Sequence, residues 1–332
     1  MAPEFYPHKC MTVERLQTQT SWILFAGDFV YKLKKPVYYD FVDARTPAKR
    51  YRICRKEIRL NRRLAPKLYI GVAGILANRG AYSLVQNAGL QEPGVLEFAI
   101  VMHRLPDDRM LGEMLASRRL GVVEIKQLAE NLAAFHRKCS IAKAKTWGSA
   151  PVLSRLIAAT ISAAEASIAD TVMRYRLAAA ARYMRAYLIT HQPLIDRRVR
   201  TGRVREGHGA LRLDSLCLTQ AIAVVGGIEH NEQLRYCDVA SELASVMIEL
   251  EIAGRNELSD ALLETYVGAA DDDELNQVIP LYKCFRAVRR GQLEMLISFQ
   301  TEMPRERRML ARHYASQWFQ FAEEIARTAR LA

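Results

Sequence analysis

The amino-acid sequence predicts an α+β protein of two lobes: a small β-rich lobe with one helix over residues 1–104 and a larger, mostly helical lobe over residues 105–332. Three observations lead to this prediction. The first hundred residues contain several short β-rich runs around a single capped helix. After Arg104-Leu105-Pro106 the apolar residues take up helical spacing. A length of 332 residues also favours two lobes over a single core.

The strands expected in the first lobe are bounded by turn signals. The runs rich in β-branched and aromatic residues are residues 21–26, 29–33, 69–76, 81–85 and 97–103. Gly27-Asp28 separates the first two runs and indicates a tight turn between them. Asn78-Arg79-Gly80 separates the next two in the same way.

One helix is expected between these runs. Thr46 is a suitable N-cap, and Pro47 follows at the first helical position, where its missing N–H costs nothing. Ile53, Leu60 and Leu64 have helical spacing, and Pro66 ends the run. The expected helix therefore occupies the stretch between residues 46 and 66.

Glu57 falls on the apolar face of that helix, between Ile53 and Leu60. A carboxylate on an apolar face is costly unless it has a cationic partner. The neighbouring basic residues occupy other faces of the helix, as expected for side chains in solvent. They are Arg52, Lys56, Arg59 and Arg63. Glu57 is therefore expected to meet a lysine from another element.

The second lobe is expected to be built mainly of helices. Apolar residues with amphipathic spacing predict helices over residues 110–116, 123–136, about 152–190, 238–253, 257–268, 273–299 and 304–330. The stretch 203–230 differs, because it contains turns and two short β-like runs at residues 216–218 and 221–225. A loop-and-strand insert is therefore expected within the helical lobe.

Composition excludes several classes of protein. Half of the residues are apolar, which excludes intrinsic disorder. The six cysteines are scattered without a C-x-x-C pair, so they predict reduced thiols and not a zinc site or disulfide scaffold. No apolar run reaches membrane-spanning length, and the first ten residues lack the apolar core of a signal peptide. A cytoplasmic protein is therefore expected, with no membrane partner.

Several separate segments together carry a resemblance to a known family. They are residues 21–37, 55–71, 204–218, 225–251 and 281–291 (LYKCFRAVRRG). In order and spacing they resemble a bacterial group of aminoglycoside-phosphotransferase-like proteins with a protein-kinase fold. The resemblance covers nearly the whole chain and implies a protein-kinase-like bilobal fold. The group sometimes carries an added P-loop kinase domain, and this sequence contains no G-x-x-x-x-G-K-[ST] loop.

The resemblance implies roles for residues of the first lobe. In such kinases a strand lysine holds the α and β phosphates of ATP and pairs with a helix glutamate. Lys32 matches the lysine, with Lys34 as an alternative because both lie on one face of the strand, and Glu57 matches the glutamate. Met102 and His103 match the hinge that binds adenine through backbone groups.

The catalytic motif departs from the family pattern. That pattern is H-G-D-x-H-x-x-N followed by a strand ending in aspartate, where the first Asp is the base and the Asn and last Asp hold Mg²⁺. In the degenerate loop 206–230 of this sequence, His208 and Gly209 match the pattern. The departures are Ala210 at the base, Arg212 at the second histidine, Ser215 at the metal asparagine and Gly226 at the metal aspartate.

These departures predict a pseudokinase, in which the fold is kept and phosphoryl transfer is lost or very weak. Loss of a general base typically costs about 10²- to 10⁴-fold in rate, and glycine offers a metal no side-chain ligand. ATP is the implied ligand, while the motif argues against Mg²⁺. Asp214 and Glu229 leave open a non-standard metal site, and with it an active phosphotransferase or nucleotidyltransferase. Asp238 is interpreted as a helix N-cap.

Positive charge is the remaining feature, with a formal net charge of +12. Residues 45–67 contain ten Lys and Arg and a single acid, and two further groups follow at Arg197–Arg205 and Arg305–Arg312. A basic module for nucleic acid or an anionic partner is therefore a second alternative. Aromatic stacking positions are sparse in these clusters, so they are interpreted as solvated surface. A small molecule or a protein is the favoured class of partner.

Overall fold

A computed structural model describes residues 3–39, 42–78, 81–142, 147–219, 222–229, 231–301 and 303–329. The chain forms two compact units. The first unit comprises Met1–Leu120 and Leu213–Leu234, and the second comprises Gly121–Arg212 and Arg235–Ala332. The lobe boundary expected after residue 104 falls inside the first unit and stays a prediction.

The first unit is built on an antiparallel six-stranded sheet with the strand order β1-β2-β3-β8-β6-β7. Its strands are β1 Val13–Gln17, β2 Ser21–Ala26, β3 Phe29–Lys34, β6 Tyr69–Asn78, β7 Ala81–Gln86 and β8 Val95–His103. The strands predicted from sequence are confirmed. Gly27 has a φ of +57° in the predicted β2–β3 turn, which glycine adopts without strain. Arg79 and Gly80 of the other predicted turn lie outside the described residues.

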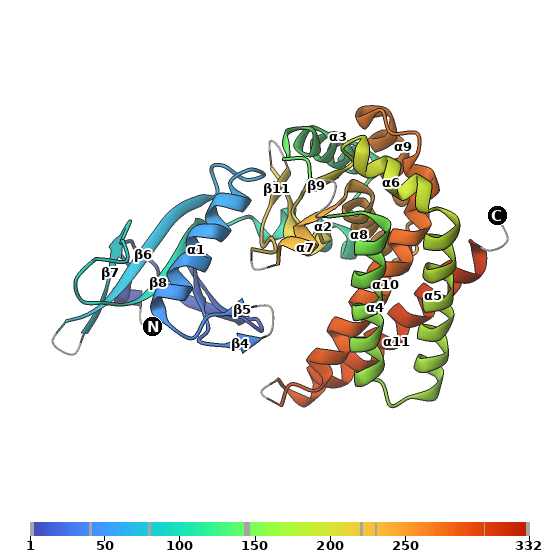
Figure 1. The fold of residues 1–332 in the computed structure, drawn as a ribbon. Coiled ribbons are helices and arrows are strands. Elements are labelled where there is room, and N and C mark those ends of the chain that lie inside the picture. Colours follow the sequence, from blue (N-terminus) through green and yellow to red (C-terminus); the bar gives the residue numbers. More distant parts are fainter. Residues whose placement is uncertain are drawn as a thin grey trace. The chain divides into compact units, whose positions relative to one another are not determined.

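Helix α1, Pro47–Asn61, packs on one face of this sheet against β8 and β6 (Figure 1). Thr46 is its N-cap and accepts a hydrogen bond from the Lys49 N–H, as the sequence predicts. Side chains alternate along a strand, so Val30 lies in the core under α1, while Tyr31 lies in a second cluster with Tyr6. The two sheet faces therefore bury separate apolar cores.

The rest of the first unit consists of short elements. They are η1 Pro3–Phe5, β4 Tyr38–Tyr39, β5 Val42–Asp43, η2 Asp107–Arg109, α2 Leu111–Ala116, η3 Leu213–Ser215, β10 Leu216–Leu218 and β11 Ile222–Val224. Strands β10 and β11 pair antiparallel and confirm the short β-like runs predicted at residues 216–218 and 221–225, of which Ala221 lies outside the described residues. Helix α2 contacts β10 and η3. The chain passes into the second unit within α7, Glu232–Arg235.

The second unit is mostly helical, as predicted (Figure 1). Its helices are α3 Val122–Lys138, α4 Ala150–Ser167, α5 Thr171–Thr190, α6 Gln192–Arg200, α8 Val239–Ile252, α9 Asn256–Ala270, α10 Leu275–Ser298 and α11 Arg305–Thr328. Helix α10 packs against α11, α8 and α4, and α3 packs against α9. A short ladder pairs β9, Val204–Glu206, with β12, Tyr236–Asp238. In the described ranges, no helix combines the length and the apolarity needed to cross a bilayer.

The long helical region expected at 152–190 is two helices. The chain leaves α4 at Ile168, and Asp170 caps α5 by accepting a hydrogen bond from the Met173 N–H. An aspartate side chain satisfies the free N–H groups at a helix start, so this position favours a new helix over continuation. Helix α6 was not predicted, because its basic residues hide its apolar side chains Leu194, Ile195 and Val199.

Candidate functional site

A buried ionic cluster joins three elements of the first unit. Lys32 and Lys34 come from β3, Glu57 from α1, and Glu229 from the segment after β11. Lys32 Nζ lies 2.7 Å from Glu57 Oε1, and Lys34 Nζ lies 2.6 Å from Glu57 Oε2. Lys34 Nζ also lies 2.6 Å from Glu229 Oε1. The expectation that Glu57 meets a lysine from another element is confirmed, with two lysines instead of one.

The local geometry explains why these four side chains meet. Lys32 and Lys34 share the strand face of Val30, which lies in the core under α1. The two ammonium groups and two carboxylates cancel in formal charge. Burial alone would lower the pKa of Lys34, but the carboxylates of Glu57 and Glu229 outweigh it and raise that pKa above its ordinary value. Lys34 therefore stays charged inside the protein.

The two lysines differ in exposure, which the sequence could not reveal. The Lys34 side chain is 4% exposed and is held by two carboxylates. The Lys32 side chain is 16% exposed and has one carboxylate partner. Lys32 is thus the more accessible cation of the pair, although the role of either lysine toward a phosphate stays a prediction.

Gly226 and Gly227 lie where the resemblance would place the metal aspartate. Gly226 is exposed and has a φ of +77°, and its N–H donates to the Tyr69 hydroxyl at 3.4 Å. The Gly227 N–H donates to Asn61 Oδ1 at 3.1 Å, and Asn61 Nδ2 donates to the Glu57 carbonyl at 2.9 Å. The side chains of α1 and β6 therefore position this segment through its backbone. Sequence reasoning missed Tyr69 and Asn61, although both lie within the matched segment 55–71.

The residues considered as substitute metal ligands have different surroundings. Glu229 is buried and bonded to Lys34, whereas Asp214 is exposed on η3. The Ser215 carbonyl accepts a hydrogen bond from the Val225 N–H at 2.9 Å, which ties η3 to the end of the β10–β11 hairpin. Within the described parts of the chain, no group of three or more His, Cys, Asp or Glu side chains is placed to hold a metal ion. A metal role for Asp214 and Glu229 stays a prediction.

The predicted hinge residues are the last two of β8, where that strand pairs with β3 and β6. Met102 is buried, and it lies opposite Val30 on β3 and Tyr69 on β6. The His103 N–H donates to the Leu68 carbonyl at 3.0 Å, and the Arg104 N–H donates to the Asp28 carbonyl at 2.7 Å. These two donors are already used within the unit. An adenine role for Met102 and His103 is untested.

The segment that resembles the catalytic motif, His208 to Arg212, lies in the second unit and is anchored at Gly209. The Gly209 N–H donates to the buried carboxylate of Glu242, and Arg286 Nη1 donates to the Gly209 carbonyl at 2.9 Å. Arg286 Nε also donates to the Ser241 carbonyl at 3.0 Å. Both peptide groups of Gly209 are thus held by charged side chains, directly before Ala210. His208 is buried beside this anchor.

Glu242 is the centre of a buried polar chain. Its Oε2 lies 2.8 Å from His136 Nε2, and His136 Nδ1 lies 2.7 Å from the Tyr266 hydroxyl. Burial alone would raise the pKa of Glu242. The hydrogen bond and charge of His136, the charge of His208 and the hydrogen bond from the Gly209 N–H outweigh burial and lower this pKa to about 2. A side chain at Gly207 would collide with the Glu242 carboxylate. Glycine at 207 is therefore required by this anchor.

Arg212 lies after this loop, at the position of the second histidine. Its Nε lies 3.7 Å from Glu249 Oε1 on α8, and Arg290 Nη2 lies 3.4 Å from the same oxygen. Glu249, Glu242 and Arg286 were not singled out from sequence. The available signal was that they fall in the matched segments 225–251 and 281–291.

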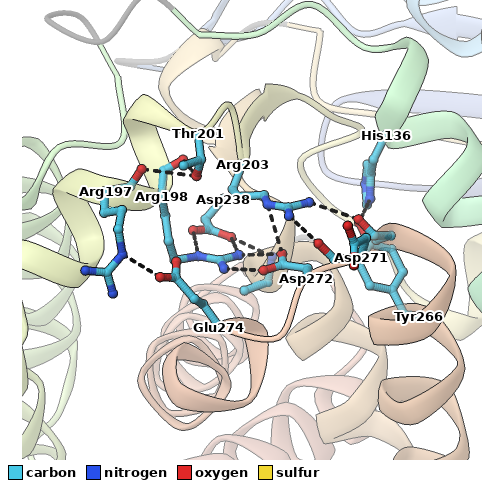
Figure 2. Close-up of polar contacts among 12 residues, drawn as sticks. His136, Arg197, Arg198, Thr201, Arg203, Asp238, Tyr266, Asp271, Asp272 and Glu274 are labelled. Carbon is cyan, nitrogen blue, oxygen red and sulfur yellow. Dashed lines mark hydrogen bonds and ion pairs between the residues drawn. The ribbon is translucent and has the colours of Figure 1, made fainter.

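A second buried ionic network fixes α6 to the start of α8 (Figure 2). Arg198 is fully buried and donates to both oxygens of Asp238 and both oxygens of Asp272, at 2.7 to 3.0 Å. Asp238 also accepts from the Ala240 N–H, which confirms its interpretation as a helix N-cap. The interpretation of the 197–205 arginines as solvated surface is wrong for Arg198. Because helix α6 was not predicted, the burial of Arg198 on one of its faces was not predicted.

Comparisons with known proteins agree with the architecture. No family model matches the chain. Solved structures that match it include a choline/ethanolamine kinase family protein from Mesorhizobium loti (TM-score 0.54, 13% identity, 96% of this chain and 92% of that one). A thermostable mutant of the aminoglycoside phosphotransferase APH(4)-Ia matches with a TM-score of 0.52, 8% identity, and 94% and 95% coverage. The chain has the aminoglycoside-phosphotransferase-like kinase fold. The α+β, protein-kinase-like fold predicted from sequence is thereby confirmed.

Further matches of this kinase-fold chain include a kinase solved with ligands and three curated relatives. Amicoumacin kinase hAmiN, solved with AMP-PNP, Ca²⁺ and Ami, matches with a TM-score of 0.52, 10% identity, and coverage of 95% and 89%. Uncharacterized proteins of Mycobacterium tuberculosis and Mycobacterium bovis are 28% identical over 324 residues, or 95% of this chain. The kinase-fold chain spans 60% of the length of these curated relatives.

Proposed function

We propose that this kinase-fold chain is a pseudokinase, a binding or regulatory protein in which phosphoryl transfer is absent or very weak. The observation that carries the proposal is the anchored peptide at Gly209 followed by Ala210. Glu242 and Arg286 still hold the loop that would position a catalytic base. The alanine side chain has no atom that accepts a proton. The backbone contacts of the loop are therefore present, but a general base is absent.

The metal positions support the same proposal. Ser215 and Gly226 stand where the resembled family has asparagine and aspartate. Mg²⁺ prefers carboxylate and carbonyl oxygens, and Gly226 supplies no side chain. Because the metal neutralises charge on the transferred phosphoryl group, its loss adds to the loss of the base.

ATP binding is part of the proposal, with Lys32 as the residue that contacts phosphate. The intact Lys32–Glu57 pair and the partial exposure of Lys32 support it. The matched amicoumacin kinase was solved with AMP-PNP. We infer that ATP binding depends on Lys32 and gains little from Mg²⁺.

Titration calorimetry with ATP, with and without Mg²⁺, tests this proposal beside an assay of ATP consumption. The expected result is binding that Mg²⁺ barely changes, that Lys32→Ala weakens, and that leads to no multiple-turnover consumption. Arg52→Ala is the matched control, because Arg52 is an exposed cation on α1. Strong Mg²⁺-dependent binding together with sustained ATP consumption would overturn the proposal.

A second candidate is an active phosphotransferase or nucleotidyltransferase that uses non-standard residues. The intact Lys32–Glu57 pair favours it, because phosphate-handling groups persist. Asp214 and Glu229 would supply carboxylates. Asp214→Asn and Glu229→Gln test it: both should reduce any measured transfer, and unchanged transfer in folded variants removes this candidate.

We also propose a cytoplasmic location, supported by six cysteines that are all unpaired.

A further inference from the structure

A cavity of about 780 Å³ lies within the first unit, between α1 and β6. Its volume is in the range of pockets that hold small molecules. The residues that line it are Arg55, Lys56, Ile58, Arg59, Arg62, Ile70, Gly71, Val72, Asn87 and Ala88. Four of these are basic and none is acidic, so an anion would be attracted to this cavity.

The basic side chains of the cavity are poorly neutralised. Arg59 is exposed, and among the described residues its guanidinium has neither a hydrogen-bond nor an ion-pair partner. The guanidinium of Arg55 is also exposed, and within the described chain it donates only to the Tyr51 hydroxyl, at 3.4 Å. Lys56 Nζ lies 3.8 Å from a half-exposed carboxylate, that of Glu232, which is a weak pairing.

Arg62 gives the cavity a fixed cationic wall. Its Nε donates to the Tyr69 carbonyl at 3.1 Å, and its Nη2 donates to the Tyr69 and Ile70 carbonyls at 2.9 and 2.8 Å. These acceptors are neutral, so the charge of Arg62 is not cancelled. The strand register shifts between Tyr69 and Gly71, which marks a bulge at Ile70.

The opposite wall is shaped by a close approach of two residues. A Cβ at Gly71 would lie 2.9 Å from Asn87 Oδ1, so the Asn87 side chain would have to shift to admit a larger residue. Ile58, Val72 and Ala88 are buried apolar residues that also line the cavity. The cavity therefore combines an apolar lining with cationic groups at its edge.

The cavity is separate from the buried ionic cluster of the candidate functional site. Arg55 and Arg59 on α1 and Arg62 at its C-cap follow one another at helical spacings of four and three. Glu57 lies on a different face with Cys54 and Asn61, which are three and four residues away. One helix thus serves two sites from two faces.

We propose that this cavity binds a small phosphorylated ligand that carries an apolar group. Guanidinium groups bind phosphate through charge-assisted hydrogen bonds, and Arg55 and Arg59 have donors to spare. The apolar lining gains from the second part of such a ligand. This site is additional to the phosphate-binding role proposed for Lys32.

Titration of the full chain with 1-naphthyl phosphate and with inorganic phosphate tests this proposal. The expected result is tighter binding of the aryl ester, because only it fills the apolar part of the cavity. Arg59→Glu and Arg55→Glu should each weaken its binding about tenfold or more, since each replaces a phosphate partner by a like charge. Both residues are exposed, so these variants are expected to fold.

Two control variants distinguish binding in the cavity from attraction to surface charge and from binding at Lys32. Arg15→Glu makes the same charge change at an exposed residue of β1, outside the lining and at the opposite edge of the sheet from β7, and should leave the affinity within about twofold. Lys32→Ala removes the cation of the other site and should also leave it unchanged. The proposal would be overturned if Arg15→Glu weakened binding as much as Arg59→Glu, if binding depended on Lys32 and not on Arg59, or if the aryl ester did not bind. Loss of ATP binding by Lys32→Ala bears on the proposed function alone.

Discussion

Lys34 Nζ lies 2.6 Å from Glu229 Oε1 and joins β3 to a segment 195 residues further along the chain. Both side chains are almost completely buried. Lys34 also meets Glu57, so one ammonium group holds two carboxylates from distant parts of the sequence. Lys34 therefore has a structural role in the first unit, and Lys32 is the more exposed of the two lysines.

Lys34→Ala is expected to destabilise the protein much more than Lys32→Ala. Without Lys34, Glu229 loses its buried partner, and breaking a buried ion pair costs about 3–5 kcal/mol. Without Lys32, Glu57 keeps Lys34. Urea unfolding of both variants measures the difference. Equal losses in the two variants would contradict this assignment of roles.

Gly226→Ala is expected to destabilise the first unit by about 1–2 kcal/mol, because a φ of +77° is unfavourable for a residue with a side chain. Nothing lies within 4 Å of a Cβ built there, so the cost comes from the backbone alone. Gly226→Asn should cost less, since asparagine tolerates this region better. Gly89→Ala is the control, because Gly89 has open space and no positive φ. Urea unfolding that ranks Ala and Asn equally would argue against backbone strain.

The pH dependence of stability is expected to include a contribution from Glu242. Its pKa is about 2 in the folded protein and 4.5 in the reference state. Ionised Glu242 therefore stabilises the fold above about pH 4.5, and this contribution disappears as the pH falls toward 2. The full contribution is about 3 kcal/mol.

Comparison of wild type and Glu242→Gln by urea unfolding at about pH 5 and about pH 3 measures this effect. The variant should be less stable at the higher pH, and the gap should narrow at the lower pH. Glu264→Gln is the control, because Glu264 is an exposed carboxylate on α9. A gap that is constant with pH would exclude a depressed pKa for Glu242.

Arg198→Met is expected to unfold the second unit or to destabilise it by about 3–5 kcal/mol, because Asp238 loses its buried cation and Asp272 keeps the longer contact to Arg203 Nε, at 3.6 Å. Arg198→Lys should recover only part of the loss, since an ammonium group cannot reproduce four fork-like bonds. Arg200→Ala, an exposed neighbour on α6, serves as the control. Thermal unfolding ranks the three variants, and similar values for Arg198→Met and Arg200→Ala would refute the network's importance.

Local patterns of the sequence predicted much of the fold. The cap at Thr46, the turn at Gly27 and the amphipathic helices all follow from residue types at short spacing. Strand β1 was missed because four of its five residues are exposed, which leaves no buried alternation to detect. Helix α6 was missed because an arginine occupies one of its buried positions.

The sequence predicted the candidate site only where a charged side chain fell on an apolar face and therefore needed an ion-pair partner. A carboxylate at Glu57 on an apolar face demanded a cation, and the structure supplies two. The anchors Glu242 and Arg286 could not be derived in this way. Their partners are peptide groups of Gly209, and a sequence pattern does not reveal which backbone groups are buried and need donors or acceptors.

In the proposed pseudokinase, the backbone conformation of Gly226 would affect any return to catalysis. An aspartate introduced there would enter a backbone conformation that disfavours side chains, before Ala210 or Ser215 had changed. The first step toward an enzyme would thus lose stability and gain no activity. A laboratory selection for phosphoryl transfer should therefore accumulate stabilising substitutions elsewhere before it accepts that aspartate.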